Sequence, residues 1–266
     1  MLSVCATPIG NLEDVTLRVL RELGEADIVL CEDTRRTRIL LDRHGISARL
    51  LSYHEHNEAA RTAELLPRLV AGDRVALVSD AGLPAISDPG TRLVAAALEA
   101  GVPMSVLPGP SAVETALVAS GLAGERYQFL GYLPRGERAL ASLWDELAGV
   151  PWPAVAFESP QRLPATLRSL AGVLPDRPLA VCRELTKQFE EVVRGTAAEV
   201  AERFPESPKG EITLVIGGGE LVGPDDRQAL EAVAELAALG VGRKQAVELV
   251  SRLTGLPRNR LYRASL

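Results

Sequence analysis

The segment that decides the fold is Val78-Ser79-Asp80-Ala81-Gly82-Leu83-Pro84-Ala85-Ile86-Ser87-Asp88-Pro89-Gly90. It begins at the end of a short apolar run, 75–78, and ends where a helical pattern over 91–100 begins. A loop so long and so rich in Gly, Pro, Ser and Asp is costly to order unless a ligand or a neighbouring domain holds it. Its place between a strand and a helix predicts an α/β fold with a ligand site beyond the carboxyl end of the strand.

Strands and helices alternate on both sides of this loop. Further strands are predicted over 2–6, 28–31, 50–53 and 104–107, and further helices over 15–23, 34–43, 58–70 and 111–120. This alternation predicts a mostly parallel sheet with helices on both faces, in a first domain over 1–121.

A second α/β domain is predicted over 126–218, with a different pattern. Its predicted strands are 128–132, 154–157, 179–183, 189–193 and 211–216, and its predicted helices 137–147, 163–174 and 197–204. Hairpin-like and crossover connections both occur, so antiparallel parts are expected. After the glycine and proline breaks near 217–224, the rest of the chain, 225–266, is predicted to be a small helical module with helices over 228–239, 243–253 and 257–264.

Composition limits the function classes that fit. The chain is 47% apolar and 24% charged, so it can bury cores and is not disordered. Its formal charge of -6 excludes a basic field over the whole protein, so any contact with nucleic acid must be local.

The cysteines and the hydropathy indicate the compartment. The three cysteines are far apart and lack C-x-x-C spacing, which favours small buried side chains over disulfides or zinc. Neither a signal-peptide pattern nor a membrane-spanning apolar run is visible. We therefore expect a cytoplasmic protein with no membrane contact.

The loops after the other strands of the first domain also carry turn and polar residues. Ala6-Thr7-Pro8-Ile9-Gly10-Asn11-Leu12 has one glycine where a dinucleotide fingerprint needs three, and no Walker lysine follows it. Leu107-Pro108-Gly109-Pro110-Ser111 is a stiff turn into a helix. Several such loops on one edge of one sheet predict a ligand crevice.

The loop after the second strand is Glu32-Asp33-Thr34-Arg35-Arg36-Thr37-Arg38. A helix N-cap explains Asp33 or Thr34. It does not explain three arginines at a helix N-terminus, where the helix dipole disfavours cations. A phosphate-rich partner does explain them. The neighbouring His54 and His56 are two residues apart without a third ligand in view, so no metal site is predicted.

Five segments of the chain, in their sequence and in their order, resemble those of one known family. They are Ala6–Leu12, Glu32–Arg35, Val78–Gly90, Pro108–Ala112 and Phe157-Glu158-Ser159-Pro160. Together they resemble the bacterial 16S ribosomal RNA 2′-O-ribose cytidine methyltransferases of the tetrapyrrole methylase superfamily, from residue 2 to about residue 217, and the helical tail fits as well. The resemblance implies two α/β domains with S-adenosylmethionine in the cleft between them, a homodimer, and a cytidine of the decoding region in assembled small subunits as the substrate.

The resemblance also implies which residues bind the cofactor. The expected cofactor-binding residues are Gly10, Asp80, Ala81, Gly82, Ile86, Ser87, Asp88, Ser111, Phe157, Leu185 and Thr213.

Methylation of a ribose 2′-hydroxyl, a very weak acid, should be helped by a base or a strong hydrogen-bond acceptor. The candidates are Asp33 and Glu32 first, then Glu158 and His54. An ordinary carboxylate is a feeble base, so orienting the substrate is the other role open to them.

The RNA is expected to contact two basic regions. The first is the arginine cluster Arg35, Arg36 and Arg38, and the second is the tail, with Arg243, Lys244, Arg258 and Arg260. From residue 240 onward only Glu248 is acidic, and three short helices with a basic last pair resemble a helix-turn-helix module. A solvated charged face or a support for the dimer is the rival interpretation of the tail.

Two other functions remain open from the sequence. A tetrapyrrole methyltransferase would share the cofactor and fold, but a macrocycle needs neither the arginine cluster nor a basic tail. A non-catalytic RNA-binding protein on a methylase scaffold would fail to bind S-adenosylmethionine in a titration.

Overall fold

A computed structural model describes residues 1–219 and 226–264, apart from the side chains of residues 226, 227, 260, 263 and 264. The predicted boundary at residue 225 and the side chain of Arg260 lie outside what it describes. Contacts within the chain define a larger unit, 1–144 with 152–217, and a smaller unit, 145–151 with 218–266.

The first sheet of the larger unit is entirely parallel. Its strands, in the spatial order β3-β2-β4-β1-β5, are β1 (Leu2–Cys5), β2 (Ile28–Cys31), β3 (Leu50–Ser52), β4 (Val75–Leu77) and β5 (Met104–Leu107). Val4 of the central strand β1 pairs with Leu77 on one side and Val106 on the other. The predicted parallel sheet is confirmed, and all of its strands end at one edge.

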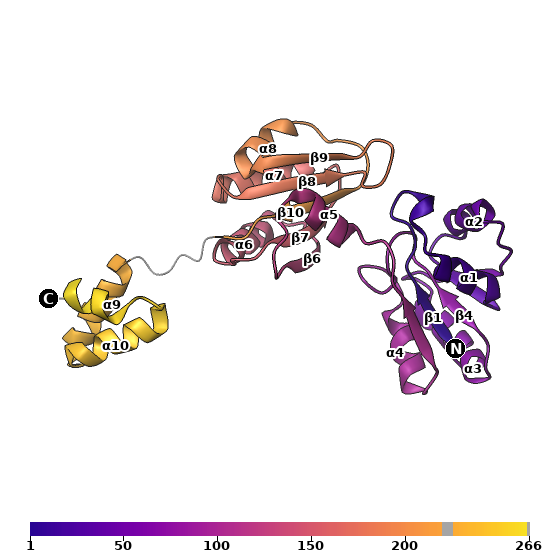
Figure 1. Cartoon of the computed structure of the whole chain (residues 1–266), viewed down its shortest axis with the longest axis horizontal. Helices are drawn as coiled ribbons and strands as arrows, with labels where there is room; N and C mark the ends of the chain where they lie inside the picture. Colours follow the sequence, from indigo (N-terminus) through magenta and orange to yellow (C-terminus); the bar gives the residue numbers. More distant parts are fainter. Residues whose placement is uncertain (220–225, 265–266) are drawn as a thin grey trace. The chain divides into compact units, whose positions relative to one another are not determined.

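Helices cover both faces of this sheet, as predicted (Figure 1). Leu2 and Val4 point to a core with α3 (Glu58–Val70) and α4 (Thr91–Glu99). Cys5, the next residue after Val4, points to the opposite core with α1 (Leu17–Glu25) and α2 (Thr34–Arg43), because side chains alternate along a strand. Burial on both faces explains why the strands read as continuous apolar runs.

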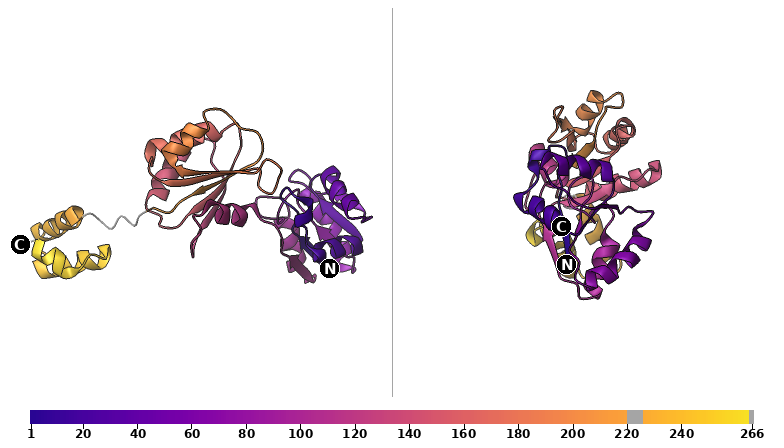
Figure 2. Two further views of the ribbon diagram at one scale, coloured as in Figure 1. Left: turned by 45° about the horizontal axis from the view of Figure 1, so that its top comes forward. Right: turned by 90° about the vertical axis from the view of Figure 1, so that its right-hand side faces the viewer.

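The second sheet is mixed, which confirms the prediction of antiparallel parts. It lies in the magenta-to-orange part of the ribbon in Figure 2. Its strands, in the order β6-β7-β10-β8-β9, are β6 (Gln128–Tyr132), β7 (Ala154–Glu158), β8 (Pro178–Arg183), β9 (Glu191–Thr196) and β10 (Ile212–Ile216). Only β6 and β7 run parallel; the other neighbours are antiparallel. The helices that follow in this region are α6 (Glu137–Ala148), α7 (Leu163–Val173) and α8 (Ala197–Arg203).

The helix α5 (Ala112–Ser120) packs on the second sheet, although the sequence places it with the first. Its buried Val113, Ala116 and Leu117 join a core with Ala180, Cys182 and Val215, residues of β8 and β10. The helix is apolar on most of its surface, so its sequence pattern does not indicate which sheet it covers.

The strand predicted over 189–193 begins later, at Glu191, and extends to Thr196. The residues before it form a turn, in which the backbone N–H of Glu190 donates to the Lys187 carbonyl at 3.1 Å. The Glu190 carboxylate in turn accepts from the Thr186 N–H at 2.6 Å. This side chain-to-backbone bond holds residues 186–190 out of the ladder.

The smaller unit contains the three helices predicted for the tail. They are α9 (Asp226–Ala238), α10 (Arg243–Thr254) and α11 (Arg258–Ala264). Their core comprises Ala229 and Val233, then Val247 and Val250, and Leu261. Among the described residues, no helix is long and apolar enough to cross a membrane.

Candidate functional site

The edge at which the parallel strands end opens into a cleft of about 560 Å³ within the larger unit. Loops of the first sheet and strands of the second both line it. Of the residues expected at the cofactor site or as catalytic groups, the lining includes Glu32, Asp80, Ala81, Gly82, Ile86, Ser87, Asp88, Ser111, Phe157, Glu158, Leu185 and Thr213. The structure therefore brings together residues that the sequence holds more than 180 positions apart.

Backbone hydrogen bonds tie the loop after β4 to the loop after β1. Thr7 and Gly82 exchange two of them, with N···O distances of 2.8 and 3.0 Å. Gly82 has a φ of 73°, the left-handed conformation that glycine adopts without strain. The buried Ser79 hydroxyl donates to the Ala81 carbonyl at 3.1 Å, which closes the turn from inside.

Asp80 connects this loop to the start of α2. Its Oδ1 accepts from the backbone N–H of Asp33 at 3.0 Å, and its Oδ2 lies 3.5 Å from Nε of Arg36. A carboxylate at a helix N-terminus is favoured by the unpaired N–H groups and by the helix dipole. Asp80 thus positions the arginine-bearing helix at the edge of the cleft.

Three carboxyl groups, Glu32, Asp80 and Asp88, lie close enough in the cleft to affect one another. Burial raises the pKa of Asp88 from 3.8 to about 6, with further increases from the charges of Glu32 and Asp80. Burial also raises the pKa of Glu32, and the charge of Asp80 adds to it. Such a cluster creates a negative potential that favours a cationic ligand.

Asp33 is committed to a structural role outside the lining of the cleft. Its Oδ1 accepts from the backbone N–H of Arg35 at 2.8 Å, the N-cap bond of α2, and its Oδ2 pairs with the Arg35 guanidinium at 2.7 Å. Hydrogen bonds from Arg35 lower the pKa of Asp33 to about 2. These contacts leave Asp33 poorly suited to accept a proton.

Glu158 lines the cleft, but other groups hold both of its oxygens. Oε1 accepts from the Ser159 N–H at 2.7 Å, and Oε2 accepts from the Thr166 hydroxyl at 2.6 Å. The Arg162 guanidinium lies 3.2 Å from Oε2, and the Glu158 side chain is fully buried. Glu158 therefore organises the turn from β7 into α7.

Aromatic side chains of the second sheet form part of the cleft wall. Phe157 makes edge-to-face contacts with Phe129 and Tyr132, at ring-centroid distances of 5.0 and 5.6 Å. Tyr132 is 66% exposed and lines the cleft, although it is not among the residues predicted from the sequence. Gly131, with a φ of 66°, precedes Tyr132 at a break in the β6–β7 register. A glycine beside an aromatic residue at a strand end is the sequence signal that could have identified Tyr132.

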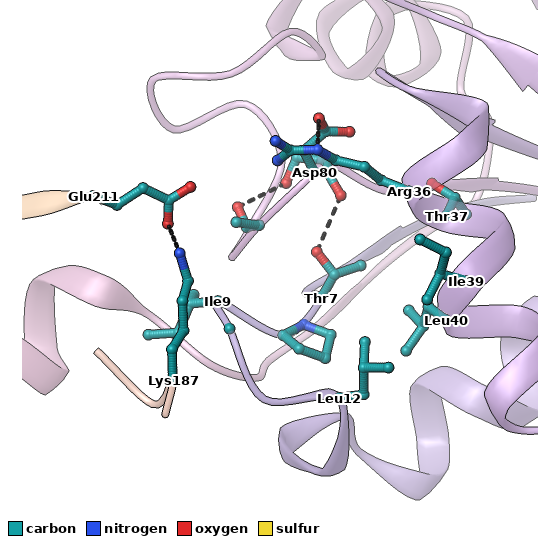
Figure 3. Close-up of a pocket in the computed structure, with 14 residues that line it drawn as sticks. Thr7, Ile9, Leu12, Arg36, Thr37, Ile39, Leu40, Asp80, Lys187 and Glu211 are labelled. Carbon is teal, nitrogen blue, oxygen red and sulfur yellow. Dashed lines mark hydrogen bonds and ion pairs between the residues drawn. The ribbon is translucent and has the colours of Figure 1, made fainter. Parts of the chain in front are cut away.

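Gly10 lies outside this lining, against the turn that follows β8. A Cβ on Gly10 would lie 2.5 Å from Cγ of Lys187 and 2.8 Å from the Leu185 carbonyl oxygen. Gly10 lines a second cavity of about 280 Å³ instead, which Figure 3 shows with Thr7, Arg36 and Lys187 around it.

The basic residues divide into two places. Arg36 lines both cavities, whereas Arg35 pairs with Asp33 and Arg38 is exposed on α2. In the smaller unit, Arg243 and Lys244 are exposed at the start of α10, and Arg258 lies 3.7 Å from Glu248. Within residues 1–219 and 226–264, no group of three or more His, Cys, Asp or Glu side chains is arranged so that it could hold a metal ion.

The fold is that of a class of methyltransferases. The family model for tetrapyrrole (corrin/porphyrin) methylases matches residues 1–201. Uroporphyrin-III C-methyltransferase from Thermus thermophilus is similar over 84% of this chain and 95% of its own, with a TM-score of 0.56 and 22% identity; another of its structures is complexed with S-adenyl homocysteine. The methyltransferase CobJ is similar over 82% of this chain and 93% of its own, with a TM-score of 0.63 and 19% identity.

Sequence relatives narrow the class. A ribosomal RNA small subunit methyltransferase I from Halalkalibacterium halodurans is 42% identical over 98% of this chain and 93% of its own length. The relative of the same name from Thermotoga maritima is 45% identical over 82% of this chain and 99% of its own. The model for the RsmI C-terminal HTH domain matches residues 223–266. The chain belongs to the ribosomal RNA small subunit methyltransferase I family, within the tetrapyrrole methylases.

Proposed function

We propose that this chain is an S-adenosylmethionine-dependent methyltransferase that methylates the ribose 2′-hydroxyl of a cytidine in 16S ribosomal RNA. The observation that carries the proposal is the 42% identity over 98% of the chain to a relative named for methylation of small-subunit ribosomal RNA. That match includes the acid-lined cleft and the helical tail alike.

The residues of the cleft fit this cofactor. S-adenosylmethionine carries a sulfonium and an ammonium group, and Glu32, Asp80 and Asp88 supply the opposite charge. The Gly82 turn and Ser111 supply backbone and hydroxyl groups, and Phe157 and Leu185 supply apolar surface. When bound, the cofactor supplies an electrophilic methyl group.

The protein's own task is then to orient the acceptor oxygen, exclude water and take up a proton. Of the three carboxyl groups ranked from the sequence, Asp33 is held by Arg35 and Glu158 is fully hydrogen-bonded. Glu32 lines the cleft, and its raised pKa makes it a better proton acceptor than an ordinary carboxylate. We assign this role to Glu32.

Further parts of the proposal concern the context of the reaction. The free, buried cysteines support a cytoplasmic location. The exposed Arg243 and Lys244 support RNA contact by the tail, to which Arg258 would add. The exposed Arg35 and Arg38 on α2 would contact the RNA as well. The proposal also includes a homodimer that acts on assembled small subunits. It keeps the predicted domains over 1–121, 126–218 and 225–266, with helix α5 at the end of the first domain packed on the sheet of the second.

An acceptor lacking the reactive oxygen tests the proposal. Small subunits reconstituted with 2′-deoxycytidine at the methylated position should take up no methyl group at that position, while subunits with cytidine there are methylated. Equal methylation of the two would place the methyl group on the base and contradict ribose methylation.

A further inference from the structure

One face of α2 beside the cleft combines cationic and apolar side chains. Arg36, Ile39, Leu40 and Arg43 are spaced i, i+3, i+4 and i+7, so they lie on the same side of the helix. Ile39 is 60% exposed, and it lines the cavity of Figure 3 together with Arg36 and Leu40. This face therefore borders an open space that no element of the described chain fills.

That space continues as a trench away from the cofactor cleft. The cavity in Figure 3 shares Ile9, Arg36 and Asp80 with the cleft. A more open hollow of about 600 Å³ adjoins it on the other side, and the two share Gly10, Leu12 and Lys187. The trench thus runs from the cleft, past Gly10, to Arg43.

Three cations lie along the trench, and each lies within ion-pair distance of at least one acid. Arg36 lies 3.5 Å from Asp80 and Arg43 lies 3.5 Å from Glu13, and both arginines are about 60% exposed. Lys187 donates to Glu184 and Glu211, at 2.8 and 2.9 Å. Long ion pairs between exposed groups contribute little stability, so a phosphate can replace the acid on either arginine.

We propose that this trench binds single-stranded RNA, with the target ribonucleotide in the cavity of Figure 3 and the neighbouring phosphates on Arg36, Lys187 and Arg43. The inference rests on the proposed function, because it names where that substrate lies. Pro8, Leu12 and Ile39 provide the apolar wall against the sugar and base. The side chains that line the trench include no aromatic, so it holds the backbone and leaves base stacking to other surfaces.

Equilibrium binding of a fluorescent oligocytidylate tests the trench without requiring turnover. Arg43→Gln is the main variant because Arg43 lies outside the cofactor cleft. We expect it to weaken binding about tenfold and to reduce the slope of log K against log salt by about 0.7, the loss of one phosphate contact. Lys187→Gln should act in the same way and Lys187→Arg should restore binding.

The matched control is Arg21→Gln, which removes an exposed arginine from α1 outside the trench, and it should bind as wild type does. The affinity for S-adenosylmethionine, measured by calorimetry, should stay within twofold for Arg43→Gln. Unchanged binding in Arg43→Gln and Lys187→Gln, an equal loss in Arg21→Gln, or no binding by the wild type would overturn the inference.

The two proposals fail in different ways. In one outcome, Arg43→Gln and Lys187→Gln both leave the KM for small subunits unchanged while methyl transfer proceeds. That result would contradict RNA binding in the trench and would leave the proposed methyltransferase function standing. RNA binding that depends on the trench, without methyl transfer to RNA, would contradict the proposed function and leave the trench as an RNA-binding site.

Discussion

At the scale of single residues, the hydrogen bonds of each carboxyl group decide what it can do. The sequence places Glu32 and Asp33 together and ranks both ahead of Glu158 and His54, but it does not show which way either points. In the structure the Asp33 oxygens bind Arg35, whereas Glu32 faces the acid cluster in the cleft. We therefore propose separate roles for the two neighbours, a structural one for Asp33 and a catalytic one for Glu32.

This division predicts opposite results for two conservative variants. Glu32→Gln should lower kcat for methyl transfer about 100-fold, the usual contribution of a general base. Asp33→Asn keeps an N-cap acceptor and loses only an exposed ion pair, so its kcat should stay within a few-fold of wild type. Steady-state turnover on small subunits measures both; a larger loss in Asp33→Asn would reverse the assignment.

The raised pKa of Asp88 predicts a pH dependence of cofactor affinity. Below about pH 6 this carboxyl holds a proton in the folded chain, and the cleft then attracts a cation less. The dissociation constant of S-adenosylmethionine should be about tenfold higher at pH 5 than at pH 7. Calorimetry at both values measures it, and Asp88→Asn should reduce the dependence.

The same shift has a consequence for stability. Between pH 3.8 and about 6 the folded chain binds more protons at Asp88 than the unfolded chain does. Asp88 therefore favours folding below this window, and that contribution is lost as the pH rises through it. A group that weakens the fold at neutral pH is typical of a binding site.

At the scale of elements, the sequence predicts the strands of the first sheet and the loops at their carboxyl ends, because the inner strands β1, β2 and β4 are short buried runs and the edge strands β3 and β5 are also mostly apolar. It does not predict that α5 covers the second sheet or that Tyr132 joins the cleft. Both depend on tertiary packing: α5 has no polar face that would fix its orientation, and a register break after Phe129 positions Tyr132.

The contact between the loop after β1 and the turn after β8 predicts the effect of a single methyl group. Gly10→Ala would place a Cβ 2.8 Å from the rigid Leu185 carbonyl oxygen, so it should lower the free energy of unfolding by about 1–3 kcal/mol. The control is Gly24→Ala in α1, where the nearest atom is 3.8 Å away and alanine should be neutral or stabilising. Urea denaturation compares them; equal stabilities would contradict the described packing.

At the scale of the whole molecule, the methylase fold and the helical tail are separate units, and each has its own core. Five short motifs in the sequence correctly indicate the tetrapyrrole methylases and, within them, the methyltransferases of small-subunit ribosomal RNA. General sequence patterns alone indicate only an α/β protein with a ligand crevice, since many enzymes share that arrangement.

Separate units predict that the tail can be removed without loss of the cofactor site. A chain ending at residue 219 should bind S-adenosylmethionine as the full chain does, because the described lining of the cleft consists of residues of the larger unit. Its KM for small subunits should rise about tenfold or more, since the basic side chains of α10 and α11 are gone. An unchanged KM would favour a structural role for the tail.

The most direct test of the central claim offers the chain a choice of acceptors. Labelled S-adenosylmethionine is supplied with small ribosomal subunits, free 16S ribosomal RNA or a porphyrinogen, and the product is digested and mapped. We predict label in the RNA of small subunits, recovered as 2′-O-methylcytidine at one position, and none in the porphyrinogen. Label in the porphyrinogen alone would contradict the account.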